Sequence, residues 1–212
     1  MSEAEIREEI CRIGASLHAR GYVHSSAGNI SARLDDGFLI TPTDACLGFL
    51  DPARLAKLDS AGKQISGDRA SKTIILHQSI YAASGSAMGI VHTHSTHLVA
   101  LSLLPDTNTG EILPPLTPYY VMKVGHVPLI PYRRPGAADV ANLVVAHIPR
   151  CRAVMLQSLG PVVWDTSVSR AAFALEELEE TAKLYLMTRA SDPRVLQRTD
   201  IDELRHAFNL CY

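Results

Sequence analysis

Three histidines lie within six positions of the chain, in the segment HTHSTH at residues 92–97. Histidine is the commonest metal ligand among side chains. His92 and His94 end the segment MGIVHTH, which predicts a buried strand, and residues two apart on a strand point to the same face. The two imidazoles are therefore expected side by side and able to reach one ion, with Thr93 pointing into the packing. His97 is expected on the following helix, in a packing or supporting role. The alternative for the pair is chance or hydrogen-bonded packing, because two ligands do not make a metal site.

The apolar pattern around this segment predicts interleaved helices and strands. Helical spacing is expected at residues 6–17, 71–85, 96–104 after a Ser95 N-cap, and 169–189 with its glutamates facing solvent. Strands are expected at 29–34 and 37–43 around a DDG turn, at 88–94, and as short strands or helix turns at 117–125, 127–132 and 152–158. This alternation favours an α/β fold in a single three-layer α/β/α domain.

Composition restricts the classes of function. The chain has 212 residues, 47% hydrophobic and 20% charged, which suits one substantial core. A net charge of -2 predicts no strong attraction to nucleic acid or acidic membranes. Apolar runs are shorter than the ~20 residues of a membrane span, and the N-terminus is charged where a signal peptide is apolar. The four cysteines lack CxxC spacing, which indicates reduced thiols in a cytoplasmic protein.

Several segments, in order, resemble the class II aldolase/adducin-head family, and especially its 3-oxo-tetronate 4-phosphate decarboxylase branch. They are SSAGNISARL, ITPT, SGDRASK, LHQSIY, IVHTHSTH, LPPLTPYYVMKVG, IPYRRPG and EELEETAKLYL. The resemblance implies a class II aldolase fold with a central, mainly antiparallel sheet over residues 1–190. Residues 191–212 would form an extension that packs on a neighbouring subunit or frays. The family commonly forms tetramers, so a homotetramer is expected.

The resemblance also implies a metal site and a catalytic acid. His92 and His94 would supply two of three histidine ligands to a divalent metal, most commonly zinc, with manganese or cobalt as alternatives. The family's third histidine is replaced by Leu159, and its catalytic glutamate, four residues before His77, is replaced by Thr73. Leucine cannot coordinate a metal.

The family's phosphate-binding turns are retained. The matching positions are Gly28, Asn29, Thr43, Ser71 and Lys72. Glycine lets backbone approach an anion, hydroxyl and amide groups donate hydrogen bonds, and Lys72 supplies a positive charge. The alternative is that these are ordinary turn and cap residues, with Lys72 a solvated surface charge.

The two replaced residues raise the question of substitutes. A third ligand could come from His126, from Gln157 or from a neighbouring subunit; alternatively, the site holds metal weakly or not at all. For His126 itself, a surface or hydrogen-bonding role is favoured. Tyr119 matches a family tyrosine that lines the substrate pocket and can donate a proton; otherwise it is a tyrosine at the rim of the core. Lys72, Tyr119 or water could return the proton that a decarboxylation needs.

The sequence therefore predicts a metal-dependent carbon–carbon lyase acting on a phosphorylated small sugar acid or ketose. Losing the glutamate damages aldol chemistry more than decarboxylation of a 3-oxo acid, because release of carbon dioxide creates the enediolate without proton abstraction. Two alternatives stay open. The chain could be a non-catalytic binding or oligomerisation module, or a lyase with a relocated site and an unfamiliar substrate.

Overall fold

The computed structural model describes residues 1–210 and contains one mixed sheet. Its strand order is β4-β3-β2-β1-β5-β8-β7-β6, and the β6–β7 pair is parallel whereas the other neighbours are antiparallel. The strands are β1 Asn29–Leu34, β2 Gly37–Ile40, β3 Ala56–Asp59, β4 Gln64–Ser66, β5 Gly89–His92, β6 Leu129–Ile130, β7 Ala153–Leu156 and β8 Gly160–Asp165. The predicted α/β fold with a mainly antiparallel sheet is confirmed.

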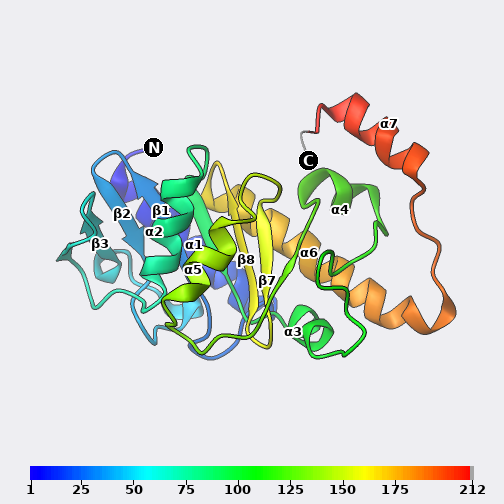
Figure 1. The fold of residues 1–212 in the computed structure, drawn as a ribbon. Helices are drawn as coiled ribbons and strands as arrows, with labels where there is room; N and C mark the ends of the chain where they lie inside the picture. Colours follow the sequence, from blue (N-terminus) through cyan, green and yellow to red (C-terminus); the bar gives the residue numbers. More distant parts are fainter. Residues whose placement is uncertain (211–212) are drawn as a thin grey trace.

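Helices cover both faces of the sheet (Figure 1). They are α1 Glu3–Ala19, α2 Ile74–Ala83, α3 Thr96–Ser102, α4 Pro118–Lys123, α5 Asp139–Val145, α6 Val168–Thr188 and α7 Arg198–Phe208, with 3-10 turns at Leu47–Phe49, Pro52–Arg54 and Arg189–Ser191. On one face, α1, α3 and α6 bury the larger core, which includes Ile10, Leu98 and Leu175. On the other, α2 and α5 bury a second core around Ile80 and Trp164. Burying apolar side chains on both faces of a sheet is what makes three layers stable.

Local sequence signals account for the elements nearest the histidines. The DDG turn joins β1 and β2, whose register pairs Leu34 with Gly37. β1 also pairs with β5, so that Asn29 lies opposite His92. The strand predicted at 88–94 is shorter than expected, because β5 ends at His92 and leaves His94 in the turn before α3.

Two glycines hold this turn in place. Gly28 has φ +78°, and a Cβ there would lie 2.5 Å from the His92 carbonyl oxygen. Gly160 has φ +142°, and a Cβ there would lie 1.9 Å from the Thr93 carbonyl oxygen. Only glycine combines these backbone angles with such close approach. The backbone from His92 to His94 therefore lies against two positions, Gly28 and Gly160, at which no side chain would fit.

One expectation for the last long helix is wrong. The glutamates of α6 were expected to face solvent, but Glu179 is buried. Its carboxylate accepts hydrogen bonds from the backbone N–H of His97 (2.9 Å) and of Leu98 (3.0 Å). A buried carboxylate is stable there because it satisfies the first turn of α3, whose N–H groups have no partner within the helix.

The C-terminal part of the described chain returns to its own domain. The Leu196 N–H donates to the Pro115 carbonyl at 2.9 Å, and α7 contacts α4 (Figure 1). Packing of residues 191–212 on a neighbouring subunit stays a prediction. Cys11, Cys46 and Cys151 are free thiols, whereas Cys211 lies outside the described residues. Within residues 1–210, no helix combines the length and apolar character that crossing a membrane requires.

Candidate active site

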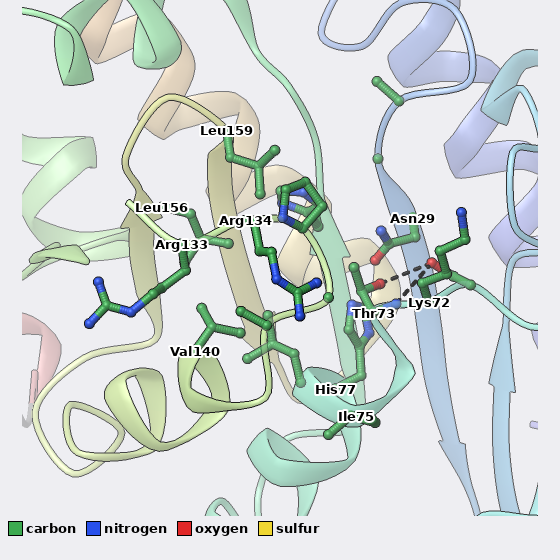
Figure 2. Close-up of a pocket in the computed structure, with 18 of the residues that line it drawn as sticks. Asn29, Lys72, Thr73, Ile75, His77, Arg133, Arg134, Val140, Leu156 and Leu159 are labelled. Carbon is green, nitrogen blue, oxygen red and sulfur yellow. Dashed lines mark hydrogen bonds between the residues drawn. The ribbon is translucent and has the colours of Figure 1, made fainter. Parts of the chain in front are cut away.

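A cavity of about 250 Å³ lies beside the histidine pair, on the α2 and α5 side of the sheet. Figure 2 shows Asn29, Thr73 and His77 on one side of it and Leu156 and Leu159 on the other. The lining segments come from the start of β1, the turn after β2, the start of α2, the end of β5, the end of β7 and the loop before α5. All the residues assigned by sequence to phosphate and metal binding line it, except His126: they are Gly28, Asn29, Thr43, Ser71, Lys72, His92 and His94.

The imidazole rings of His92 and His94 lie close together, although only His92 belongs to a strand. The two ring centroids are 5.1 Å apart and the rings are inclined at 63°. The Nδ1–H of His92 donates to the Pro161 carbonyl oxygen at 2.8 Å, which leaves the Nε2 lone pair free. Burial, with a smaller contribution from His94, lowers the pKa of His92 to about 4. Burial, followed by the nearby His24, lowers the pKa of His94. Both imidazoles are therefore neutral near pH 7, the form that binds metals.

His97 does not join the pair, as expected. Its Nδ1 lies 2.8 Å from the Glu179 carboxylate, on the side of the sheet away from the cavity. Thr93 packs inward, with its Oγ1 2.5 Å from the Oγ of Ser95. Ser95 occupies the predicted N-cap position, but its hydroxyl donates to the Tyr22 carbonyl instead of capping α3.

His77 is the buried histidine of the cavity. It lies on α2 with no exposed surface, and its Nδ1 is 2.7 Å from the Ser31 Oγ. The Ser31 Oγ is in turn 2.8 Å from the Tyr81 hydroxyl. Burial, followed by His92, lowers the pKa of His77 to about 3. Among residues 1–210, no group accepts from or donates to its Nε2, which is buried, and the residue as a whole lines the cavity.

The residues expected from the sequence to bind phosphate offer their side chains more than their backbone groups. The Thr43 N–H donates to the Arg69 carbonyl at 2.9 Å, and the Ser71 N–H donates to the Thr41 carbonyl at 3.2 Å. The Asn29 Oδ1 is buried and has no partner among the described residues. The ammonium of Lys72, the hydroxyl groups and the Asn29 amide are therefore the groups available to an anion.

The two replaced family positions both face the cavity. Leu159 is the last residue of the turn between β7 and β8, and it packs on the core beneath α5. Thr73 lies just before α2, and its Oγ1 is 3.0 Å from the Ser71 Oγ (Figure 2). Neither side chain can coordinate a metal firmly or act as a general base near pH 7.

The three other residues suggested by sequence are engaged elsewhere. His126 does not line the cavity, and its Nδ1 is 2.5 Å from the Glu111 carboxylate. Gln157 lines the cavity, but its Oε1 accepts from the Tyr132 N–H at 3.0 Å. Tyr119 is 57% exposed on α4, beneath the Lys123 ammonium and outside the cavity of its own chain. Residues 1–210 contain no group of three histidine, cysteine, aspartate or glutamate side chains that could hold a metal.

Sequence reasoning missed three charged residues that line the cavity. Arg133 is tied to Asp139 at 2.5 Å, whereas Arg134 points into the cavity in Figure 2. Both belong to the segment IPYRRPG, which had contributed only to the resemblance. Asp44 lines the rim and is exposed. An arginine that points into a cavity could not be found from spacing, because a loop sets its direction.

Comparison with known proteins gives the same picture over almost the whole chain. The model of the class II aldolase and adducin N-terminal domain matches residues 8–186. The chain belongs to this family. It is 60% identical to the 3-oxo-tetronate 4-phosphate decarboxylase of Cupriavidus necator, with 98% of this chain and 97% of that protein covered. It is 30% identical to the L-fuculose phosphate aldolase of Escherichia coli, with 91% and 88% covered.

Solved structures of the class II aldolase family share the fold. The YgbL protein of Klebsiella pneumoniae superimposes with a TM-score of 0.93 at 43% identity, covering 97% of this chain and 100% of that one. An L-fuculose 1-phosphate aldolase superimposes with a TM-score of 0.86 at 21% identity, which shows the fold alone. The predicted membership of the family and its fold are confirmed.

The divalent metal that the class II aldolase family implies finds two fitting ligands in this chain. His92 is neutral, oriented by Pro161 and beside His94, so the pair would hold an ion. Catalytic zinc sites usually have three protein ligands. The described residues supply no third one, because Leu159 occupies its place and His126 lies elsewhere. Metal binding is therefore expected to be weaker here than at a three-histidine site.

Proposed function

We propose that this chain is a carbon–carbon lyase that decarboxylates a phosphorylated 3-oxo sugar acid, of the 3-oxo-tetronate 4-phosphate type. The observation that carries the proposal is the combination of residues in one cavity. Hydroxyl, amide and ammonium side chains that suit a phosphate line the same cavity as His92 and His94, whereas position 73 carries a threonine and not a general base. The relatives named as decarboxylases, at up to 60% identity among those compared, support the same reaction.

The reaction needs the groups that the cavity retains. Asn29, Thr43, Ser71 and Lys72 would bind the phosphate and fix the substrate's orientation. The bond between the carboxyl carbon and its neighbour breaks, and its electron pair moves toward the 3-oxo oxygen as carbon dioxide leaves. No proton is abstracted in this step, so Thr73 does not prevent it. The resulting enediolate then takes one proton on carbon. We assign the donation of this proton to Lys72, which lines the cavity.

The remaining site assignments are proposed with the function. A divalent ion held by His92 and His94, most commonly zinc, would act as a Lewis acid on the substrate oxygens. Tyr119 lies outside its own cavity, so a role in proton transfer would require a neighbouring subunit. The homotetramer and the cytoplasmic location stay predictions. The partner is a small phosphorylated acid; nucleic acid and membrane binding are not expected at a net charge of -2.

The test is a comparison of two reactions on the same preparation. We expect the zinc-supplemented protein to release carbon dioxide from 3-oxo-tetronate 4-phosphate and to cleave fuculose 1-phosphate far more slowly. His94→Ala should abolish decarboxylation, and Thr73→Glu should raise the aldol cleavage because it restores a general base. Equal rates with both substrates would argue for an aldolase.

A binding or oligomerisation module is the second candidate, favoured by Thr73 and Leu159. Both replace groups that do chemistry in the class II aldolase family. This reading predicts no turnover of either substrate and no metal retained on purification. Release of carbon dioxide that depends on His94 would exclude it.

A further inference from the structure

We propose that His77 donates a hydrogen bond from its Nε2–H to the substrate oxygen on which negative charge develops. This inference rests on the proposed decarboxylation. It concerns an atom that the phosphate and metal assignments do not use. His77 has no exposed surface and lines the cavity, and its Nε2 has no partner in the described part of the chain.

The hydrogen bonds behind His77 determine which ring nitrogen carries the proton. Ser31, His77 and Tyr81 form a buried chain, with the Ser31 Oγ 2.7 Å from the His77 Nδ1 and 2.8 Å from the Tyr81 hydroxyl. The Tyr81 hydroxyl has no hydrogen-bond partner other than Ser31 within residues 1–210. Its proton must therefore go to Ser31, because the reverse direction would leave a buried phenol proton without an acceptor.

The direction of the first hydrogen bond determines the direction of the second. Ser31 accepts from Tyr81 and so donates its own proton to the His77 Nδ1. A neutral imidazole that accepts at Nδ1 carries its proton on Nε2. The nitrogen without a partner, Nε2, is thus a donor, which makes His77 unsuitable as the missing third metal ligand. This assignment of His77 agrees with the finding that residues 1–210 contain no group of three histidine, cysteine, aspartate or glutamate side chains that could hold a metal.

The positions of Ser31 and Asn29 place this donor beside the substrate. Both residues lie on β1 two positions apart, so their side chains share the face toward α2. Figure 2 shows His77 and Asn29 facing the same space as Thr73. When the carboxylate leaves, the 3-oxo oxygen gains negative charge, and a fixed neutral donor stabilises that charge without a proton transfer. Because Leu159 replaces a metal ligand and metal binding is expected to be weaker, the His77 donor would supply more of the stabilisation of this negative charge.

The experiment combines nitrogen NMR with kinetics on the full, zinc-supplemented protein. Histidine labelled with nitrogen-15 should show His77 protonated on Nε2 and not on Nδ1. Addition of phosphoglycolohydroxamate, a planar phosphorylated imitation of an enediolate, should shift the Nε2–H resonance. Finding the proton on Nδ1, or no response to this probe, would overturn the inference.

Three variants separate the donor from a packing role. His77→Leu should lower kcat by about 10²–10³-fold with little change in KM, and His77→Gln, which keeps an N–H near Nε2, should recover part of it. Tyr81→Phe leaves His77 in place and keeps the ring stacked on Phe38, so it serves if the leucine variant does not fold. It should lower the population protonated on Nε2; an unchanged tautomer would contradict the donor direction.

The two arms also distinguish this inference from the function on which it rests. If the wild-type protein releases no carbon dioxide, the proposed decarboxylation fails, and the NMR titration alone decides whether Nε2–H meets an anionic oxygen. If decarboxylation proceeds and His77→Leu retains wild-type kcat, the function stands and the inference fails.

Discussion

Replacing Leu159 with histidine should convert a two-ligand site into a three-ligand one. Leu159 lines the cavity with His92 and His94, and Gly160 holds the following backbone against Thr93. Leucine and histidine are similar in size, so the new ring can occupy the same space. The variant supplies the nitrogen that the described residues lack.

The size of the effect follows from the energetics of zinc sites. Structural zinc sites with four protein ligands bind with about 10–16 kcal/mol, or roughly 3 kcal/mol per ligand. At 1.4 kcal/mol for each factor of ten, Leu159→His should lower the zinc Kd by about 10²-fold. The assay is competition with a chromophoric chelator at pH 7.5, where His92 and His94 are neutral because burial lowers their pKa values.

Leu159→Ala is the matched control, because it removes the leucine without adding a ligand. It should bind zinc as the wild-type protein does. Adding His94→Ala to Leu159→His should cancel the gain. A Kd for Leu159→His within about threefold of the alanine control would refute the convergence of these three positions on one ion.

Three further predictions concern charge in and behind the cavity. Arg134→Ala should raise KM for the phosphorylated acid about tenfold, an effect that salt reduces because the guanidinium is exposed; Arg133→Ala, whose guanidinium is tied to an aspartate, is the comparison. Because the pKa values of His77 and His92 are lowered on folding, the unfolded chain binds more protons than the folded one below about pH 6.5. The free energy of unfolding should therefore fall by roughly 4 kcal/mol between pH 7 and 5 in urea titrations, and a flat profile would contradict neutral burial. Glu179→Ala should lower the free energy of unfolding by about 2–4 kcal/mol, since it removes the acceptor for the first turn of α3, whereas Glu179→Gln should cost less.

Local patterns were enough for the elements that carry strong periodicity. The helix over residues 6–17, the DDG hairpin and the buried strand before the histidines could all be predicted, because each follows from alternating or helical spacing of apolar residues. The exact end of that strand could not. Gly160, distant in sequence, packs on Thr93 at the point where the chain leaves the sheet, and spacing within the strand carries no signal for this contact.

The candidate site could likewise be predicted only in part. Residue types and resemblance identified the cavity residues from Gly28 to His94, but not what each atom contacts. The capping of α3 by Glu179 joins residues about 80 positions apart, so spacing within the helix placed that carboxylate on the wrong side. Likewise, the pairing of His126 with Glu111 is set by the path of a loop. The donor role of His77 depends on Tyr81 and Ser31 together, which only coordinates bring into contact.

The paired glycines at 28 and 160 have a consequence for how this scaffold diversifies. Because other segments pack closely on the backbone around His92 and His94 at both glycines, we expect changes in chemistry to come from replacing individual side chains while the backbone keeps its path. Positions 73 and 159 are such exchangeable points, one on each wall. Variants that alter these two positions alone should change the chemistry of the cavity while the backbone around His92 and His94 keeps its path.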